Sequence, residues 1–169
     1  MKIILETDRL LLRELNVEDA IHFYELNLNP VVIQYTGNNA FNDVNDAKNF
    51  LDNYNDYKEN GYGRWAVIEK SNNSFLGWCG LKYNKNSEET DIGFRFFEHY
   101  WNKGFATESA KACIDYGFNT LHLKTIIGRV MKENIASVKV LEKIGLEYSK
   151  DFNFDGHQGV IYKINNIKI

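Results

Sequence analysis

Three strand-like segments follow one another between residues 65 and 97, and an amphipathic helix comes directly after them. The segments are 65–69, 75–83 and 88–97, and short polar turns separate them. Strands joined by tight turns pair with their sequence neighbours, so this run predicts an antiparallel meander. Residues 104–120 carry apolar side chains at helical spacing, which predicts a helix with one face on the sheet. This order of elements is typical of a mixed α/β chain.

The N-terminal part adds one strand and two helices to this pattern. Residues 9–13 are mostly apolar and predict a buried strand, and Asn16 is a suitable N-cap for the helix that follows. A second helix is predicted over 44–57. Its polar face is acidic and is interpreted as a solvated surface, with Asp43, Asp46, Asp52 and Asp56.

The C-terminal part completes the sheet. Residues 124–131 predict a strand, and a helix is predicted to begin at Asn134 and to end at Gly145. Residues 146–169 predict two more strands. We therefore expect one domain over residues 1–169, with a single, mostly antiparallel sheet of about seven strands and about four flanking helices.

Composition excludes several classes of function. The net charge of −3 gives no diffuse positive field that would hold nucleic acid. Cys79 and Cys113 form no CxxC pair, and the four histidines have no metal-ligand spacing, so no metal site is expected. The early charges at the N-terminus do not fit a signal peptide, and no run of about 18 apolar residues predicts a membrane span. We expect a cytoplasmic protein with reduced thiols and no membrane partner.

A short turn joins the strand at 88–97 to the helix at 104–120, and it contains Asn102, Lys103 and Gly104. The first amides of a helix lack internal partners and the helix dipole adds positive character, so this turn suits a pyrophosphate. Gly104 would let a phosphate approach the backbone, and Lys103 would add a charge. The turn is neither a P-loop nor a GxGxxG motif. The alternative is that Gly104 only makes the turn.

Three blocks of the sequence carry a family resemblance. Ile92-Gly93-Phe94, followed by residues 100–108 (YWNKGFATE), resembles the acetyl-CoA motif of the GNAT N-acetyltransferases. It is most similar to the branch that acetylates the N-termini of ribosomal proteins. Residues 134–146 resemble the Asn-x-x-Ser…Leu-Glu-Lys-x-Gly-Phe element of that branch, and residues 7–13 resemble its first strand. The blocks occur in family order over nearly the whole chain.

The resemblance implies how the fold is used. The fourth and fifth strands of such enzymes splay apart, and the pantetheine arm of acetyl-CoA binds the open backbone of the fourth strand. Here that backbone belongs to Phe94, Arg95 and Phe96. Asn134 is implied to contact the cofactor or to close the strand cleft. The pyrophosphate is implied to lie on the turn and helix start from Asn102 to Thr107, which comprise Asn102, Lys103, Gly104, Phe105, Ala106 and Thr107, and Trp101 before them is also expected to bind the cofactor.

The chain departs from the family pattern at three positions. Trp101 stands where the general motif begins with Gln or Arg, and Asn102 replaces a glycine that is usual in this branch. Asparagine tolerates positive φ better than most residues, so the turn is expected to survive. Leu141 stands where many GNAT enzymes carry a tyrosine that protonates the thiolate, so that role is not transferred to it.

Acetyl transfer to an ammonium group requires a base, and the departing thiolate requires a proton. Asp91 is the candidate base, directly or through water, and its alternative role is to end a strand facing solvent. Ser137 is the candidate donor to the thiolate, and its alternative role is to cap a helix alongside Asn134. Tyr35, Tyr62, Arg64 and Trp65 are candidates for the acceptor pocket, although aromatic residues in such places are more often core.

The sequence therefore favours an acetyl-CoA-dependent N-acetyltransferase that uses direct attack by a primary amine. The acceptor is expected to be a protein N-terminus, a polyamine or another small amine, and a homodimer is left open. One alternative is a non-catalytic acyl-CoA-binding sensor on the same fold, suggested by Leu141. Another is a nucleotide-binding domain that uses the turn at Gly104, although the fingerprints of such domains are missing.

Overall fold

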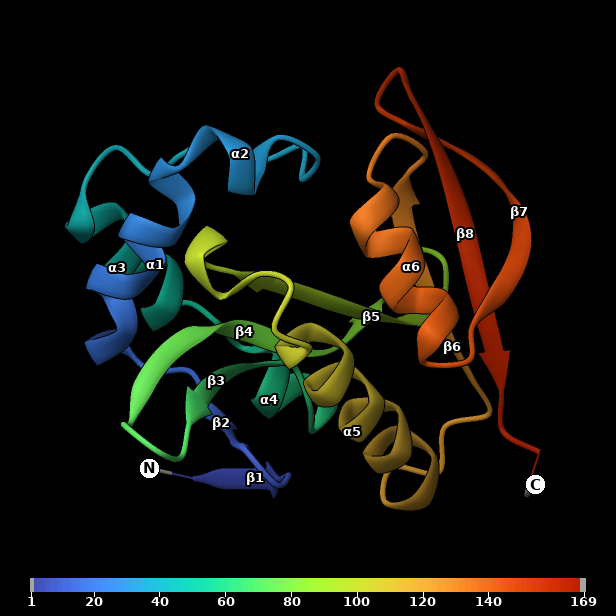
Figure 1. The fold of residues 1–169 in the computed structure, drawn as a ribbon, viewed down its shortest axis with the longest axis horizontal. Helices are drawn as coiled ribbons and strands as arrows, with labels where there is room; N and C mark the ends of the chain where they lie inside the picture. Colours follow the sequence, from blue (N-terminus) through green and yellow to red (C-terminus); the bar gives the residue numbers. More distant parts are fainter. Residues whose placement is uncertain (1, 168–169) are drawn as a thin grey trace.

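A computed structural model describes residues 2–167, which form a mixed α/β fold around one eight-stranded sheet (Figure 1). The strand order is β1-β2-β3-β4-β5-β6-β8-β7. The strands are β1 (Ile3–Glu6), β2 (Leu10–Glu14), β3 (Arg64–Glu69), β4 (Ser74–Asn84), β5 (Glu89–Phe96), β6 (Thr125–Met131), β7 (Glu147–Phe154) and β8 (His157–Asn165). Neighbouring strands run antiparallel except β5 and β6, which are parallel.

Helices cover both faces of this sheet. They are the 3-10 helices η1 (Val17–Asp19) and η2 (Glu98–Tyr100) and the α-helices α1 (Ala20–Leu28), α2 (Pro30–Ile33), α3 (Val44–Asp52), α4 (Asp56–Asn60), α5 (Phe105–Asn119) and α6 (Ile135–Lys143). The fold class expected from the sequence is confirmed: one mostly antiparallel sheet flanked by helices. The count of about seven strands was low by one, because the short edge strand β1 was not predicted.

One predicted helix, at 44–57, is wrong as a single element. Helix α3 ends at Asp52 and α4 begins at Asp56. The side chain of Asn53 donates to the carbonyl of Asn49 over 2.8 Å, a local bond that competes with helix continuation. This break, together with the one-turn helix α2, accounts for more helices than the expected four. The predicted cap at Asn16 is confirmed, since its side chain accepts from the amide of Glu18.

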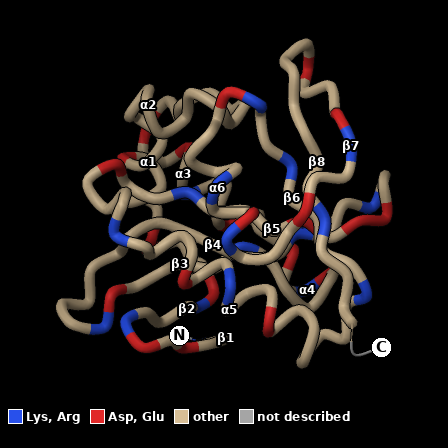
Figure 2. The backbone as a smooth tube through the Cα atoms, turned by 45° about the vertical axis from the view of Figure 1, so that its right-hand side comes forward, with Lys and Arg blue, Asp and Glu red and all other residues tan. Residues whose placement is uncertain are grey.

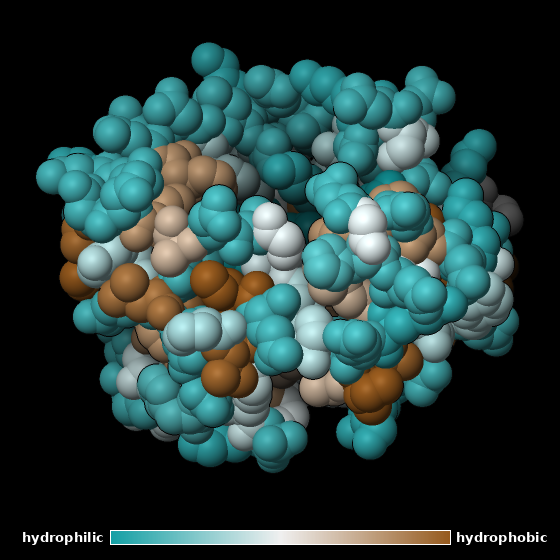
Figure 3. All heavy atoms as spheres, turned by 90° about the horizontal axis from the view of Figure 1, so that it is seen from above, coloured by the Kyte–Doolittle hydropathy of each residue, from teal (hydrophilic) through white to brown (hydrophobic). Residues whose placement is uncertain are grey.

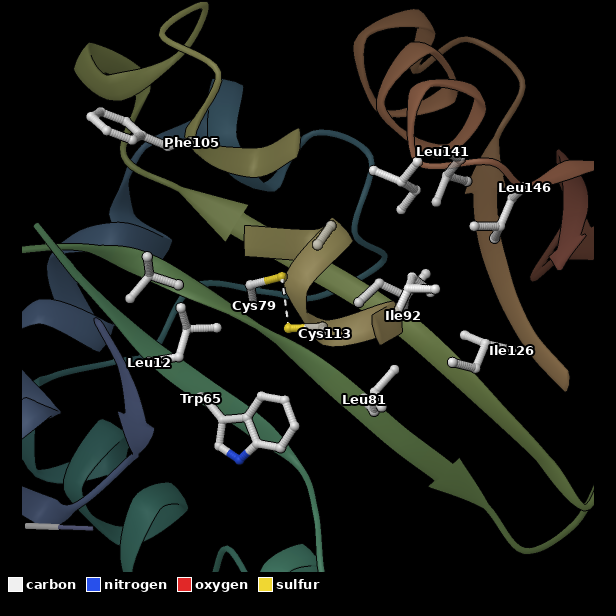
Figure 4. Close-up of a cluster of buried hydrophobic side chains, with 14 of the residues drawn as sticks. Leu12, Trp65, Cys79, Leu81, Ile92, Phe105, Cys113, Ile126, Leu141 and Leu146 are labelled. Atoms are coloured by element: carbon white, nitrogen blue, oxygen red, sulfur yellow. Dashed lines mark hydrogen bonds between the residues drawn. The ribbon is translucent and has the colours of Figure 1, made fainter. Parts of the chain in front are cut away.

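The core is divided between the two faces of the sheet because strand side chains alternate. One cluster packs under α5 and α6 and includes Trp65, Leu81 and Ile92 (Figure 4). Cys79 and Cys113 lie within it as free thiols, with their sulfur atoms 3.8 Å apart. A second cluster joins α1 and α3 to the opposite face through Phe23, Leu51, Ala66 and Phe75.

The sheet opens between β5 and β6. The two strands pair at one register position only, Asp91 opposite Ile127, whereas β5 pairs with β4 along its whole length. Beyond Asp91 the part formed by β6, α6, β8 and β7 stands away from the rest of the sheet (Figure 1). Viewed from above, the surface is hollowed between the two parts (Figure 3). The splayed strand pair expected from the sequence is present.

Candidate active site

The turn before α5 has the backbone of an anion-binding nest. Asn102 has φ of +59° and Gly104 has φ of +81°, so left-handed residues alternate with ordinary ones. Successive amides in such a turn point to one side and form a concave anion site. Gly104 is also the N-cap of α5 and provides no side-chain acceptor for the first-turn amides. The positive φ anticipated for Asn102 is confirmed, and the turn is suited to a phosphate group.

Arg9 and Glu108 hold this turn in place. The Arg9 Nε donates to Glu108 Oε2 over 2.6 Å, and its Nη1 donates to the carbonyl of Lys103 over 3.0 Å. The Arg9 guanidinium also lies 4.5 Å from the ring centre of Phe105. Burial favours a higher pKa for Glu108, but hydrogen bonds from Thr7 and Arg9 outweigh it and lower the pKa. This role of Arg9 is not visible in the sequence, because its partners Lys103 and Glu108 lie 94 and 99 positions away.

The open side of β5 lies next to the turn. Trp101 Nε1 donates over 2.9 Å to the carbonyl of Phe96, which ties the turn to the end of the strand. Phe96 is buried and Phe94 partly buried in the α5-side core, so these side chains anchor the strand. Pairing with β6 does not extend past Asp91, so the backbone at Phe94 and Phe96 faces the opening between β5 and β6, which we call the splay. Lys103 lies over the ring of Tyr100, with 5.5 Å from Nζ to the ring centre.

Asp91 lies at the closed end of the splay, between two arginines. Arg64 donates to its Oδ1, and Arg129 Nη1 donates to its Oδ2 over 3.1 Å. Arg129 also donates to Glu89 over 2.6 Å. The Asp91 side chain is 19% exposed, so it does not simply end a strand facing solvent. The two arginines come from different parts of the splayed sheet, and Asp91 joins those parts.

Helix α6 carries the other candidate residues. Asn134 caps the helix by accepting from the amide of Ser137 over 3.2 Å. Within residues 2–167 the Ser137 hydroxyl makes no hydrogen bond, so Ser137 contributes to the cap through its backbone alone. Leu141 is buried against Gly128 of β6, where an added Cβ would lie 2.7 Å from Leu141 Cδ2. This contact seats α6 closely on β6.

Two of the aromatic candidates for the acceptor pocket are core residues. Tyr62 is buried and shares a hydrogen bond of 2.6 Å with Thr90, and Trp65 is buried against Tyr116. Arg64 instead approaches Asp91 from the opposite face of the sheet. Tyr35 lies partly buried between α2 and α3. The alternative reading of Tyr62 and Trp65 as core residues is therefore the right one.

An open groove of about 680 Å³ adjoins Asp91 on the face away from α5. Asp91 and Arg129 form part of its wall, and α4 contributes Asp56 and Glu59. The rest comes from the β4–β5 turn and the tip of the β7–β8 hairpin, at 82–86 and 152–155. Both signs of charge line it. Along the described chain Lys and Arg positions are interspersed with Asp and Glu positions (Figure 2).

Residues 2–167 contain no group of three or more His, Cys, Asp or Glu side chains that could hold a metal ion. Over the same residues, no helix has the length and apolar character needed to cross a bilayer.

The sequence matches known acetyltransferases. The family model described as acetyltransferase (GNAT) domain matches residues 9–147. An uncharacterized protein of Bacillus subtilis, YkkB, is 35% identical over 152 residues, which is 86% of each chain. An uncharacterized N-acetyltransferase of Bacillus licheniformis, p20, is 32% identical over 145 residues, or 85% of this chain and 82% of that protein.

Solved structures share the fold. A GNAT-family acetyltransferase from Bacillus anthracis has a TM-score of 0.82 and 28% identity, over 98% of this chain and 99% of that one. Ribosomal-protein-S5-alanine acetyltransferase from Vibrio fischeri has a TM-score of 0.79 and 17% identity, over 96% of both chains. Spermidine N-acetyltransferase from Vibrio cholerae, solved with CoA and spermine, has a TM-score of 0.78 and 21% identity, over 95% and 97%. The last two likenesses concern the fold alone.

Proposed function

Because the chain belongs to the GNAT acetyltransferase family, we propose that it moves an acetyl group from acetyl-CoA to a primary amine by direct attack. It is an N-acetyltransferase, as its relatives are named. The observation that supports the donor is the nest at Asn102–Gly104, which lies beside the open backbone of β5. An anion site next to an unpaired strand edge fits a cofactor with a pyrophosphate and an amide-bearing arm.

In this proposal, acetyl-CoA binds to residues that border the opening between β5 and β6. The turn and first helical residues, 101–107, hold the pyrophosphate through backbone amides and Lys103. The backbone of Phe94, Arg95 and Phe96 holds the pantetheine arm, and Asn134 borders the same opening from α6. When bound, acetyl-CoA supplies the acetyl group as a thioester. No metal has a part in this scheme.

Ser137 and Asp91 divide the proton transfers. The Ser137 hydroxyl lies on the first turn of α6 and makes no hydrogen bond among the described residues; it gives its proton to the departing thiolate and takes one back from water. Asp91 accepts the amine proton through water, because guanidinium groups already contact both of its oxygens. The acceptor is a primary amine of a protein N-terminus or a small molecule. The proposal includes a location in the cytoplasm, where acetyl-CoA is available.

Calorimetry with acetyl-CoA, ATP and NAD tests the donor site, and release of free thiol with a panel of amines and peptides tests the reaction. We expect binding of acetyl-CoA and not of ATP or NAD, followed by amine-dependent thiol release. A protein that does not bind acetyl-CoA would refute the proposal. Tight binding with no turnover across the panel would instead identify the non-catalytic sensor suggested by Leu141.

A further inference from the structure

Arg95 is a partly buried cation on the β5 face away from α5. Its guanidinium donates to Asn27 Oδ1 on α1 and, over 3.0 Å, to Asn38 Oδ1 in the loop after α2. It also lies over Trp78, with 5.3 Å from Cζ to the ring centre. Asn27 is only 3% exposed and holds one side of the guanidinium in place, whereas Asn38 is exposed.

This cation has no counter-charge in the part of the chain that the structure describes. Within residues 2–167, no Asp or Glu forms an ion pair with Arg95, and its hydrogen-bond acceptors are neutral amides. Burial and the nearby Arg64 lower the pKa of Arg95 to about 10. Removing a charge from water without a counter-charge costs free energy, and an anion that reached Arg95 would offset that cost. The amides hold the guanidinium but do not neutralise it.

Arg95 lies close to the proposed site of reaction. It is the neighbour of Phe94 on β5, and it shares its face of the sheet with Asp91 and Gly93. Arg64 covers Gly93, since a Cβ added there would lie 2.6 Å from Arg64 Cζ. An acceptor that reaches the splay from this face would therefore meet guanidinium groups first.

The guanidinium groups next to Arg95 favour an anion. Arg64 and Arg129 share Asp91, and Arg129 also contacts Glu89, so three guanidinium groups with Arg95 lie beside two carboxylates. Asp56 and Glu59 line the far wall of the groove at Asp91, so the positive charge is local to the guanidinium groups, which would repel a positively charged part of an acceptor placed against them. An acceptor that adds one negative charge would balance it and leave its amine free to react.

We propose that Arg95 binds an anionic group of the acceptor, so that the preferred acceptor is an amine that also carries a carboxylate or a phosphate group. The planar guanidinium fork suits both groups. This inference rests on the proposed acetyl transfer to a primary amine and names the class of acceptor for that same site.

Matched acceptor pairs test the inference. Each pair consists of an α- or ω-amino acid and the primary amide of the same acid. Aminoalkyl phosphonates test a phosphate-like anion, and spermidine tests a polycation. In the presence of acetyl-CoA, kcat/KM is measured by thiol release for wild type and for Arg95→Gln. We expect wild type to prefer acids over amides, and Arg95→Gln to reduce the acid-to-amide ratio by about 10-fold to 100-fold. Comparing ratios between variants cancels differences in amine pKa.

Two further variants separate anion binding from a structural clamp. Asn38→Ala removes one hydrogen bond but keeps the cation, so it should retain the wild-type ratio. Lys48→Gln removes an exposed cation on α3 and should change nothing. If Arg95 is only a clamp, Arg95→Gln and Asn38→Ala will lower the rates with acids and amides equally, which overturns the inference.

Failure of the proposed role of Arg95 can be distinguished from failure of the proposed acetyl-CoA site. A wild-type protein that binds acetyl-CoA yet prefers amides or spermidine, or accepts no acid, contradicts the role of Arg95 and leaves the donor site intact. A preference for phosphonates over carboxylates selects the phosphate form of the inference. Loss of acetyl-CoA binding in wild type would instead refute the proposed function itself.

Discussion

Arg9 and Glu108 form an ion pair across 99 positions of the chain, with 2.6 Å between Nε and Oε2. The pair connects the loop before β2 to the first turn of α5. Because Arg9 also donates to the carbonyl of Lys103, the pair fixes the backbone that forms the proposed pyrophosphate site. The binding turn is therefore held by Arg9, a residue far from the turn in the sequence, through the turn's own carbonyl at Lys103 and the neighbouring Glu108.

Gly104→Val should weaken acetyl-CoA binding by at least about tenfold. A β-branched residue is strained at a φ of +81°, and its Cβ would lie 3.3 Å from Arg9 Nη2. Calorimetry measures the change in Kd. Gly61→Val is the matched control, because Gly61 has the same φ of +81° but open space around it and lies away from the turn. It should reduce stability without changing Kd, and equal Kd effects in both variants would remove Gly104 from the site.

Glu108→Gln should remove a pH dependence of stability. The folded pKa of Glu108 is lowered, so its contribution is present above the unfolded value of about 4.5 and is lost as pH falls through the folded value. Thermal unfolding between pH 3 and pH 6 should show a steeper loss for wild type than for the variant. Parallel curves for the two proteins would contradict the stabilising role of this carboxylate.

Ser137→Ala and Asp91→Asn should lower turnover by about 100-fold or more while acetyl-CoA still binds. The Ser137 hydroxyl has no structural hydrogen bond among the described residues, so its loss should leave the melting temperature unchanged. Asp91→Asn also removes ion pairs to Arg64 and Arg129 and should lower the melting temperature. Ser71→Ala, in an exposed turn, is the control for the serine substitution. Full turnover in Ser137→Ala would exclude Ser137 as the thiolate donor.

Asp19→Asn should lower the free energy of unfolding by about 3–5 kcal/mol. Asp19 and Arg13 form a doubly hydrogen-bonded pair with side chains only 3% and 11% exposed, so the variant leaves a buried cation unpaired. Urea unfolding gives the free energy. Glu14→Gln is the comparison, because its partner Lys2 is 70% exposed and the change should stay within about 0.5 kcal/mol.

Local features of the site were predictable because neighbouring residues decide them. Gly104 and Asn102 tolerate positive φ, and the apolar spacing after them is enough to specify α5. The helix at 44–57 failed for a local reason too, since helical periodicity continues through Asn53 although its side chain hydrogen-bonds back to Asn49. The edge strand β1 is four residues long, too short for alternation to be recognised.

The charged part of the site was not predictable in this way. Arg64, Asp91 and Arg129 come from three strands, and nothing near any of them in the sequence indicates the other two. Arg95 was assigned to the cofactor through its backbone, and the seat of its side chain on Asn27 and Asn38 depends on how α1 and the next loop pack on the sheet.

The sequence by itself determined the order of the main strands and helices, apart from β1, α2 and the break between α3 and α4. It also determined the glycine turn before α5 and the family to which the chain belongs, because backbone preference and side-chain periodicity act over a few residues. Only the tertiary structure decided that Arg9 and Glu108 hold the turn, that β5 and β6 pair at Asp91 alone, and that Arg95 is partly buried with no ion-pair partner within residues 2–167. Those contacts join residues tens of positions apart, and the sheet register and helix packing that create them are cooperative properties of the whole fold.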